Sequence, residues 1–297
     1  MTPPTASVVV VSRDRPEMLC RTVLSLRHLD HPAFEVVVVA DGPGLAALAR
    51  AGLDGPLKTA RMDAANISAA RNAGLALAAG EVVAFLDDDA VPEPTWLSRL
   101  AAPLAADAAA ATGFVRGRTG ISLQWGAVEV AADAAERPLP GEGTRVVPPA
   151  EGRAVKLHGT NMALRREVLA TLGGFDPAYR FFLDDTDLAL RLAAAGCAVA
   201  VVPGAEVHHA FAPSPRRGQG REPLSLTEIG ASLAVFLGRH VPPDRPDVQA
   251  AAIDRQRRAE HARLMRHLGA GRIGPKDVAR LKGEFELGLA EGAVRPR

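Results

Sequence analysis

Residues 81–89 read Glu81-Val82-Val83-Ala84-Phe85-Leu86-Asp87-Asp88-Asp89, an apolar run that ends in three carboxylates. An uninterrupted apolar run of this length is typical of a strand that is buried on both faces, as in a parallel sheet. Open α/β sheets bind their ligands at the carboxyl ends of the strands. The stretch therefore predicts an α/β fold with a binding site at the acidic triplet.

The spacing of the three carboxylates indicates what they bind. Because successive side chains of a strand point to opposite faces, Asp87 and Asp89 share one side and Asp88 faces the other. Two carboxylates on one side suit a hard divalent cation, which takes oxygen ligands and keeps positions open for phosphate oxygens. The alternative is an N-terminal cap for the next helix, but a cap needs one Asp and not three. We therefore expect a metal site.

Strands and helices alternate on both sides of this stretch. Apolar runs at 7–12 and 34–40 predict two more buried strands. Helical patterns separate or follow the strands, which is the order of βαβ units with a mainly parallel, Rossmann-like sheet flanked by helices. Further along, we expect a loop, two helices and a last strand. Their ranges are 137–153 for the loop, 163–172 and 185–195 for the helices, and 198–203 for the strand.

The chain changes character after the last predicted strand. Residues 213–223 are polar and basic, and they predict a boundary between residues 1–215 and residues 216–297. Helical patterns at 224–240 and 248–267 predict a C-terminal helical extension. Its amphipathic pattern is compatible with a homodimer, with peripheral contact to a membrane surface, and with packing on the rest of the chain.

Composition excludes several classes of protein. Hydrophobic residues make up 47% and charged residues 23% of the 297 residues, so we expect a sizeable core rather than disorder. The net charge of +1 gives no reason to expect a nucleic-acid partner. Cys20 and Cys197 suit small side chains in a reducing compartment. Residues 1–12 lack the pattern of a signal peptide, so we expect a cytoplasmic protein.

Several separated motifs resemble one enzyme family. In chain order they are Val9-Val10-Val11-Ser12-Arg13, Val39-Ala40-Asp41-Gly42, Asn66 to Gly74, and Phe85 to Asp89. Together they resemble the family 2 glycosyltransferases of GT-A fold, over about residues 7–210. The resemblance implies a nucleotide-binding half over about residues 1–115 and an acceptor half over about 116–215. It also implies that a sugar passes from a nucleotide diphosphate to an acceptor hydroxyl with inversion, with Mn²⁺ or Mg²⁺ required.

The resemblance also implies roles for individual residues. Asp89 would hold the metal against the diphosphate. Asp87 would lie near the donor's ribose and the metal, with Asp88 nearby. The remaining donor-binding residues implied by the motifs are Ser12, Arg13, Asp41 at the base, and Arg71 near the base and diphosphate.

A second acidic motif lies at the start of a predicted helix. Residues 181–191 resemble the family's Glu-Asp-x-Asp-Leu pattern, with Asp184 where Glu is more usual. The resemblance makes Asp185 the catalytic base, and Asp184 is the second candidate. An inverting transfer needs a base within hydrogen-bond reach of the attacking hydroxyl, which a carboxylate can supply. For Asp187 and Arg191 we expect only an i,i+4 ion pair.

Two further positions have open alternatives. Asn161 lies in a segment that resembles the family's Gly-x-Asn-x-Ala, so it either lines the site near the sugar or caps a helix. In some relatives a histidine after the last strand completes the metal site. Imidazole is an ordinary ligand for Mn²⁺. We expect His208 to be this ligand, with His209 as the alternative.

Three other functions compete with a glycosyltransferase. Gly42-Pro43-Gly44-Leu45-Ala46-Ala47 fits a dinucleotide-binding fingerprint, but Pro43 lacks the N–H that such a turn uses. A sugar nucleotidyltransferase usually has a Gly-rich loop after its first strand, where this chain has Ser12 to Pro16. A non-catalytic binding module would leave both acidic motifs without a role. We therefore expect a nucleotide-sugar donor, with UDP or TDP favoured, and a glycan, lipid-linked or small-molecule acceptor.

Overall fold

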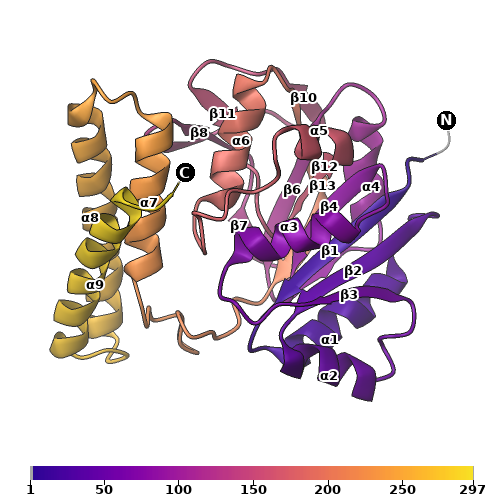
Figure 1. Cartoon of the computed structure of the whole chain (residues 1–297), viewed down its shortest axis with the longest axis horizontal. Coiled ribbons are helices and arrows are strands. Elements are labelled where there is room, and N and C mark those ends of the chain that lie inside the picture. The colour runs from indigo at the N-terminus through magenta and orange to yellow at the C-terminus, as the bar shows by residue number, and fades with distance from the viewer. Residues whose placement is uncertain (1–2, 297) are drawn as a thin grey trace.

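The computed structural model of the chain describes residues 3–296 and is built around one long, twisted sheet (Figure 1). The order of its strands is β10-β13-β6-β12-β4-β1-β2-β3, with β5 paired to β13 and β7 paired to β6. The strands are β1 (Ala6–Ser12), β2 (Phe34–Ala40), β3 (Leu57–Arg61), β4 (Val82–Asp87), β5 (Ala90–Pro92), β6 (Ala110–Gly117), β7 (Leu123–Trp125), β10 (Arg145–Val147), β12 (Met162–Arg165) and β13 (Val199–His209).

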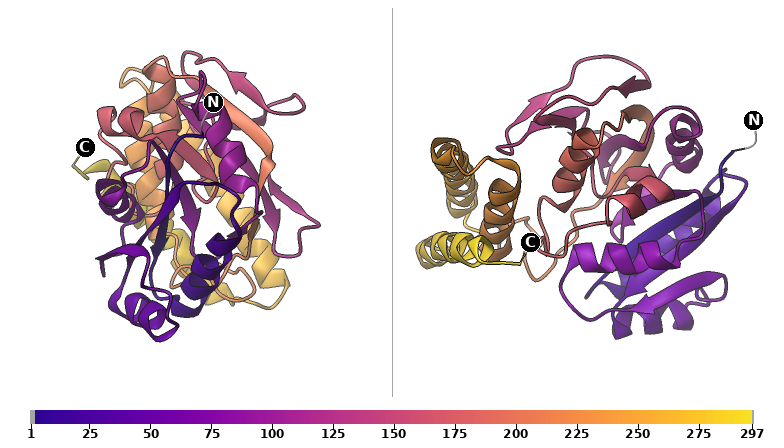
Figure 2. Two further views of the ribbon diagram at one scale, coloured as in Figure 1. Left: turned by 90° about the vertical axis from the view of Figure 1, so that its right-hand side faces the viewer. Right: turned by 45° about the horizontal axis from the view of Figure 1, so that its top comes forward.

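Helices cover both faces of this sheet, as the uninterrupted apolar strands predict. Val8 and Val10 of β1 belong to one buried cluster, and Val9 belongs to another on the opposite face. The first cluster includes side chains of α1 (Pro16–Ser25), α2 (Gly42–Arg50) and α4 (Trp96–Leu104). The second includes side chains of α5 (Arg166–Thr171) and α6 (Asp184–Ala194), with Leu75 of α3 (Ile67–Leu77) packed against it. The views in Figure 2 show these helical layers around the sheet.

The sheet is parallel in its N-terminal part and mixed beyond it. Strands β3, β2, β1 and β4 are mutually parallel, as are β6 and β13. Strand β12 runs antiparallel to both of its neighbours, β4 and β6. We predicted a helix over 163–172, but residues 162–165 form this strand and the helix begins at Arg166. The prediction was wrong because the buried backbone of this segment finds its hydrogen bonds in the two adjacent strands.

Residues 137–153 were predicted as a loop but contain short strands. A small separate sheet of order β11-β8-β9 is formed by β8 (Val128–Ala131), β9 (Glu136–Pro138) and β11 (Arg153–Val155). Prolines made the segment look irregular, yet Pro138 is tolerated because β9 is an edge strand, where a missing N–H costs no ladder bond.

The C-terminal extension consists of α7 (Thr227–His240), α8 (Pro246–Gly269) and α9 (Pro275–Ala293). Helix α9 was not predicted as a separate element. Helices α7 and α9 pack closely at glycines, which have no Cβ atom. A Cβ atom at Gly230 would collide with the carbonyl oxygen of Phe285, and one at Gly288 with that of Thr227. Among residues 3–296, no helix combines the length and the apolar character that crossing a membrane requires.

A buried carboxylate joins the extension to the rest of the chain. Asp187 of α6 is inaccessible to solvent, and its Oδ1 lies 2.8 Å from Nε2 of His240 and 3.2 Å from Nη1 of Arg239, both on α7. Arg191 donates from Nε to Asp187 Oδ2 at 2.7 Å, so the predicted i,i+4 pair is present. Burial by itself would raise the pKa of Asp187, but these partners outweigh it and hold that pKa below its usual value.

Candidate active site

A cavity of about 630 Å³ lies at the carboxyl ends of the parallel strands, where the acidic triplet predicted a site. Ser12 at the end of β1, Asp87 at the end of β4 and His209 at the end of β13 line it. Asp184 and Asp185, the first residues of α6, line the same cavity. The two acidic motifs therefore share one space, although almost a hundred positions separate them in the chain. The extension also contributes to its wall, through Ile229 of α7 and Arg263 of α8.

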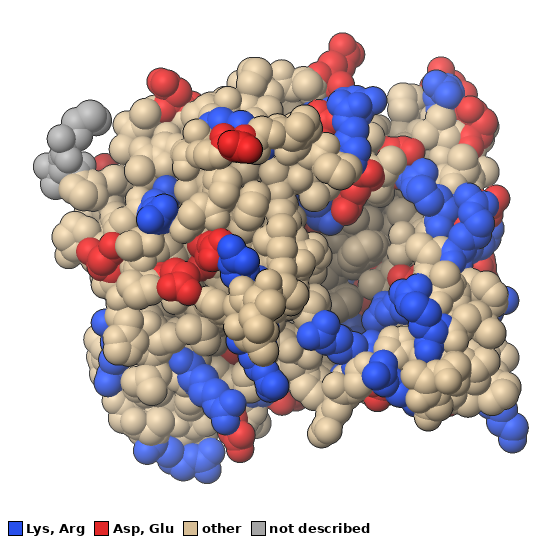
Figure 3. All heavy atoms as spheres, turned by 180° about the vertical axis from the view of Figure 1, so that it is seen from behind, with Lys and Arg blue, Asp and Glu red and all other residues tan. Residues whose placement is uncertain are grey.

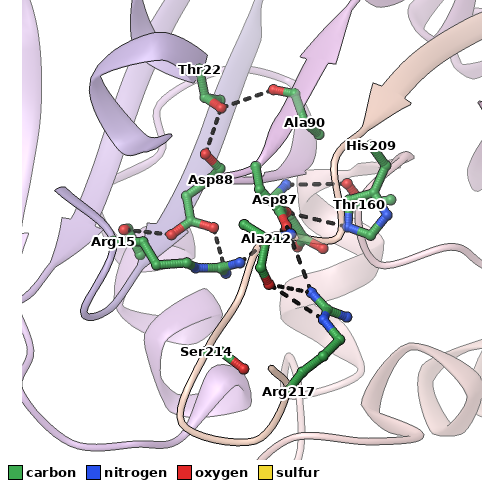
Figure 4. A network of polar contacts seen from close by, with 12 residues as sticks. Arg15, Thr22, Asp87, Asp88, Ala90, Thr160, His209, Ala212, Ser214 and Arg217 are labelled. Carbon is green, nitrogen blue, oxygen red and sulfur yellow. Dashed lines mark hydrogen bonds and ion pairs between the residues drawn. The ribbon is translucent and has the colours of Figure 1, made fainter. Parts of the chain in front are cut away.

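The acidic triplet divides its side chains as the strand alternation predicts. Asp87 and Asp89 line the cavity, whereas Asp88 is inaccessible to solvent and absent from its wall. Asp88 accepts a 2.6 Å hydrogen bond from Ser12 Oγ, and its Oδ1 lies 2.5 Å from Nη2 of Arg15 (Figure 4). Burial, assisted by the negative charge of Asp89, raises the pKa of Asp88 to about 7, although Arg15 opposes the shift. Asp88 therefore contacts other groups of the protein, Ser12 and Arg15, and not the cavity.

Asp87, Asp89 and His209 form a cluster that could hold a metal ion. One possible ligand atom from each of them lies within 4.8 Å of the other two. Asp89 Oδ1 is 3.2 Å from His209 Nε2. Its Oδ2 accepts from the backbone N–H of Ala212 at 2.8 Å and lies 3.1 Å from Nη1 of Arg15. Burial would raise the pKa of Asp89, but the contacts with His209, Arg15 and Ala212 outweigh it and hold that pKa well below its usual range.

His209, rather than the predicted His208, belongs to this cluster. The two side chains leave β13 in opposite directions, as neighbours in a strand do. Nε2 of His208 lies 2.6 Å from a carboxylate oxygen of Glu93, and His208 is not part of the cavity wall. The expectation for His208 is therefore corrected: its side chain cannot join Asp87 and Asp89 from the opposite face of the strand.

Gln124 fixes the orientation of the His209 ring. Nε2 of Gln124 donates to the carbonyl oxygen of His209 at 3.0 Å. This bond directs Oε1 of Gln124 to Nδ1 of the His209 ring, at 3.1 Å. A carboxamide oxygen only accepts, so this contact places a proton on Nδ1. Nε2 is then the nitrogen that faces Asp89. An outer hydrogen bond of this kind is the usual way in which a protein orients a histidine ligand.

The second acidic motif places its two carboxylates differently. Leu183, just before α6, has the left-handed φ of 66° and turns the chain so that the helix starts at the cavity. Asp184 is almost fully buried and accepts a hydrogen bond from Arg71 Nη1. Burial, with the charge of Asp185 added, raises the pKa of Asp184 to about 7 against the opposing effect of Arg71. Asp185 is half-buried and accepts from the backbone N–H of Gly159 at 2.8 Å.

Arg71 connects the two acidic motifs. Besides its bond to Asp184, its Nη2 donates to the carbonyl oxygen of Gly159 at 2.9 Å and lies 3.5 Å from Asp87 Oδ1. The guanidinium also lies over the ring of Phe175, 5.4 Å from its centroid. Burial lowers the pKa of Arg71, but the surrounding carboxylates, Asp184 first, outweigh it and raise that pKa above its usual value. Arg71 is thus a permanent cation between the two acidic motifs.

Asn161 and Asp41, two of the predicted donor-binding residues, form hydrogen bonds with other groups of the protein. Asn161 is inaccessible to solvent: its Oδ1 accepts from Trp96 Nε1, and its Nδ2 donates to the carbonyl oxygens of Phe114 and Ala205, all at 2.8 Å. Asp41 caps α2 by accepting from Gly44 N–H at 2.9 Å, and its Oδ2 accepts from Asp14 N–H after β1 at 2.8 Å. Neither residue is part of the cavity wall; Asn161 lies in the interior, and the contact of Asp41 with the base stays a prediction.

Gly44 of the dinucleotide-like fingerprint is explained by the same cap. A Cβ atom at Gly44 would lie 2.9 Å from Asp41 Oδ1 and 3.1 Å from Ala40 Cβ, so a larger residue would disturb the start of α2. Gly42 and Gly44 are not part of the cavity wall. Helix packing therefore accounts for the pattern without a dinucleotide.

The other predicted donor residues, Ser12 and Arg13, line the cavity. Several side chains that the motifs did not identify line it as well. Arg15 reaches Asp88 and Asp89, and Arg217 lies 3.8 Å from Asp89 Oδ2. Trp125 stacks on His158 with 5.8 Å between ring centroids. The run of arginines at 216–221 was a signal for Arg217, but as a sequence pattern it indicated only a boundary.

Two known proteins are similar to part of this chain. The N-acetylglucosaminyl-diphospho-decaprenol L-rhamnosyltransferase of Mycobacterium tuberculosis is 39% identical over 94 residues, which cover 31% of this chain and 29% of that protein. The O-antigen biosynthesis protein RfbC of Myxococcus xanthus is 31% identical over 214 residues, which cover 66% of this chain and 16% of that protein. The chain thus spans less than a third of the length of either relative.

Solved structures share the fold. GalNAc-T7 with UDP, GalNAc and Mn²⁺ is 21% identical with a TM-score of 0.61, over 84% of this chain and 51% of that one. The mannosyltransferase PcManGT from Pyrobaculum calidifontis, in complex with GDP-Man and Mn²⁺, is 19% identical with a TM-score of 0.59, over 98% and 88%. Residues 3–219 match the model of the family described as glycosyltransferase like family 2. The chain belongs to this glycosyltransferase family and has the predicted GT-A fold.

Proposed function

We propose that the protein transfers a sugar from a nucleotide diphosphate to an acceptor hydroxyl with inversion at the anomeric carbon, in a reaction that depends on a divalent cation. The observation that carries the proposal is the arrangement of two acidic groups on one cavity. Asp87, Asp89 and His209 form one group, and Asp185 belongs to the other. An in-line displacement needs a stabilised leaving group and a base for the attacking hydroxyl, and the two groups offer these separately.

The donor atoms of Asp87, Asp89 and His209 fit a divalent cation. Two carboxylates suit Mg²⁺ or Mn²⁺, and the added imidazole favours Mn²⁺. A cation bound there would neutralise negative charge on the leaving diphosphate. Arg15 and Arg217 border the same carboxylates and add fixed positive charge at this edge of the cavity. Both solved neighbours were determined with Mn²⁺ and a nucleotide or nucleotide sugar, which supports this choice.

Asp185 is the proposed base. Its carboxylate reaches the cavity, and the N–H of Gly159 and the hydroxyl of Thr186 hold it at 2.8 Å and 3.1 Å. The raised pKa of Asp184 would suit a stronger base, but its carboxylate is almost fully buried and bound to Arg71. We therefore propose that Asp184 and Arg71 are positioning residues, which hold the start of α6 and Gly159 in place beside Asp185. Asp184 is the alternative base that the experiments below must separate from Asp185.

For the substrates we propose a UDP- or TDP-sugar and a glycan or lipid-linked acceptor. Ser12, Arg13 and Asp87 line the cavity and are the proposed donor contacts, while Asp88 and Arg71 act by holding neighbouring groups in place. The acceptor class is supported by the rhamnosyltransferase relative, whose name describes a sugar on a lipid diphosphate. We also propose a cytoplasmic location.

A homodimer and a peripheral membrane contact through the extension are further predictions. Met265 of α8 and Leu287 of α9 are 43% and 56% exposed, and such side chains favour either contact. Light scattering after size exclusion tests the dimer, and co-sedimentation with vesicles of anionic lipid tests the membrane contact.

The proposed reaction is tested by donor selection followed by product analysis. A thermal-shift panel of UDP, TDP, GDP, CDP and NADH, each with and without Mn²⁺, first identifies the base. A ligand that binds only the native state raises the melting temperature. The anomeric configuration of the transferred sugar is then determined by NMR and compared with that of the donor. A product of opposite configuration supports the proposal, whereas a product that keeps the donor's configuration contradicts inversion. Stabilisation by NADH alone would contradict the transferase assignment.

A further inference from the structure

Positive side chains gather at the end of the cavity next to the extension. Lys and Arg side chains, with some Asp and Glu side chains between them, border a hollow on the face shown in Figure 3. The arginines that line the cavity include Arg13 and Arg15 after β1, Arg216 and Arg217 in the segment before α7, and Arg263 of α8. These residues come from three parts of the chain, and Arg263 lies outside the family match to residues 3–219. Their convergence calls for a negatively charged ligand or for nearby carboxylates.

Aromatic rings hold the guanidinium groups of Arg216 and Arg217 in place, and Arg221, which is not part of the cavity wall, shares a ring with Arg217. Arg216 lies over Phe181, 4.6 Å from its centroid. Arg217 and Arg221 both lie over Phe211, at 5.0 Å and 4.6 Å. Stacking uses the flat face of a guanidinium and leaves its N–H groups at the edge available for oxygen atoms. Arg216 and Arg221 are therefore positioned without their donors being used by the rings.

The backbone of the segment between β13 and α7 also indicates a ligand site. Phe211 and Arg221 have φ values of 52° and 66°, the left-handed region that residues other than glycine adopt only at a cost. Both strained residues belong to the two-arginine stack on the Phe211 ring. Strain of this kind persists where surrounding structure imposes it, and it is concentrated at ligand sites.

Carboxylates of the protein neutralise only part of this cluster. Within residues 3–296, neither Arg216 nor Arg221 forms an ion pair, and Arg263 has one partner, Glu260 on its own helix, at 3.4 Å. Burial lowers the pKa of Arg216; the charge of Glu228 opposes this shift and that of Arg13 adds to it. Burial also lowers the pKa of Arg217; Asp89 and Asp87 oppose the shift, while Arg15 and Arg263 add to it. Like charges face one another here, so a bound anion would relieve their repulsion.

The donor accounts for only part of this charge. Arg15 and Arg217 lie next to Asp89, so we assign both to the donor's diphosphate, which would bind beside the metal cluster. Arg216 and Arg263 have no such contact within the part of the chain that the structure describes. We propose that Arg216 and Arg263, which line the same cavity, form a second anion site that binds a phosphate or diphosphate group carried by the acceptor. The inference rests on the proposed function, and it assigns the extension a direct role in acceptor selection.

The test measures binding of phosphate compounds while the donor site is filled. Isothermal titration uses the full-length protein saturated with Mn²⁺ and with the nucleoside diphosphate that stabilises it. The probes are decyl diphosphate and glucose 1-phosphate. We expect the wild type to bind at least one probe, and Arg216→Gln and Arg263→Gln each to weaken that binding by about tenfold or more. The affinity for the nucleoside diphosphate should change less than about twofold.

Arg257→Gln is the matched control. Arg257 lies on α8 like Arg263, but it pairs with Asp254 and Glu286 and is absent from the cavity wall. It should bind both probes like the wild type. Tighter binding of decyl diphosphate would identify the group as that of a lipid-linked acceptor, and equal binding would identify a water-soluble sugar phosphate. Both results support the second site.

Four results would overturn it. The wild type would bind neither probe, or the two arginine variants would bind both as well as the wild type does. Alternatively, the variants would lose the nucleoside diphosphate instead, which would assign the whole cluster to the donor. A loss confined to binding of anionic vesicles would make it a membrane contact. If no nucleoside diphosphate binds in the presence of metal, the proposed function itself fails, and titration of the probes into the free protein still decides whether the anion site exists.

Discussion

Arg71 and Asp184 form a buried ion pair that links the helix after β3 to the first turn of α6. Both side chains are about 5% exposed or less. At pH 8, where the Asp184 carboxyl is mostly ionised, breaking this buried pair leaves one charge without its partner, so Arg71→Ala should lower the free energy of unfolding by about 3–5 kcal/mol. Urea unfolding followed by circular dichroism measures it. The double variant Arg71→Met/Asp184→Leu should recover most of the loss, and an equal loss in both variants would contradict the argument.

The raised pKa of Asp184 predicts a dependence of stability on pH. Because its pKa is about 7 in the folded protein and lower in the unfolded chain, the folded state binds an extra proton between about pH 4 and pH 7. This group therefore lowers the free energy of unfolding as pH rises through that range, by about 1.4 kcal/mol per pH unit, and its effect levels off above pH 7.

Urea titrations at pH 5, 6 and 7 check this prediction in the absence of metal. Asp184→Asn removes the titrating group, so the free energy of unfolding should fall less steeply as pH rises. The change in slope should correspond to about one bound proton. An unchanged slope in this variant would show that the carboxyl of Asp184 is not protonated near neutral pH.

Adjacent histidines provide a matched test of the metal cluster. His209→Ala should weaken Mn²⁺ binding by at least about tenfold, because one of three ligands is lost. His208→Ala should bind Mn²⁺ like the wild type, since its side chain contacts Glu93 on the other face of β13. The increase in melting temperature over a Mn²⁺ titration measures both. The opposite order would restore His208 as the ligand.

Asn161 should matter for stability rather than for donor binding. Its carboxamide serves Trp96 and two backbone carbonyls in the interior, so Asn161→Ala leaves a buried N–H without a partner and should cost about 1–3 kcal/mol. Chemical unfolding measures the loss. The affinity of the folded variant for the nucleoside diphosphate should stay within about twofold of the wild type. A selective loss of donor affinity would return Asn161 to the site.

Much of the fold could be predicted because its signals are local. The continuous apolar runs of β1, β2 and β4 specify strands buried on both faces, and the carboxylates after β4 mark the edge where ligands bind. Strand β12 could not be predicted in this way. Its four residues, 162–165, also suit a helix, and only the neighbouring strands decide between the two structures.

The site was less predictable where side-chain direction matters. A motif that contains His208 and His209 does not show which of them faces Asp89, because that depends on the register of β13 against β6. Asp41 and Asn161 stand at the expected positions of their motifs, yet their polar atoms are used by the backbone nearby. Arg217 and Arg263 approach the cavity through tertiary packing, which no local pattern describes.

The most direct test of the central claim is the transfer rate of Asp185→Asn with the donor identified by thermal shift. The account predicts a kcat about 10²–10⁴-fold below that of the wild type, as for loss of a general base, with donor and Mn²⁺ affinities unchanged. Asp184→Asn, measured in parallel, should retain more activity. A variant at Asp185 that keeps wild-type turnover, or one that fails only because it no longer binds the donor, would contradict the assignment of Asp185 as the base.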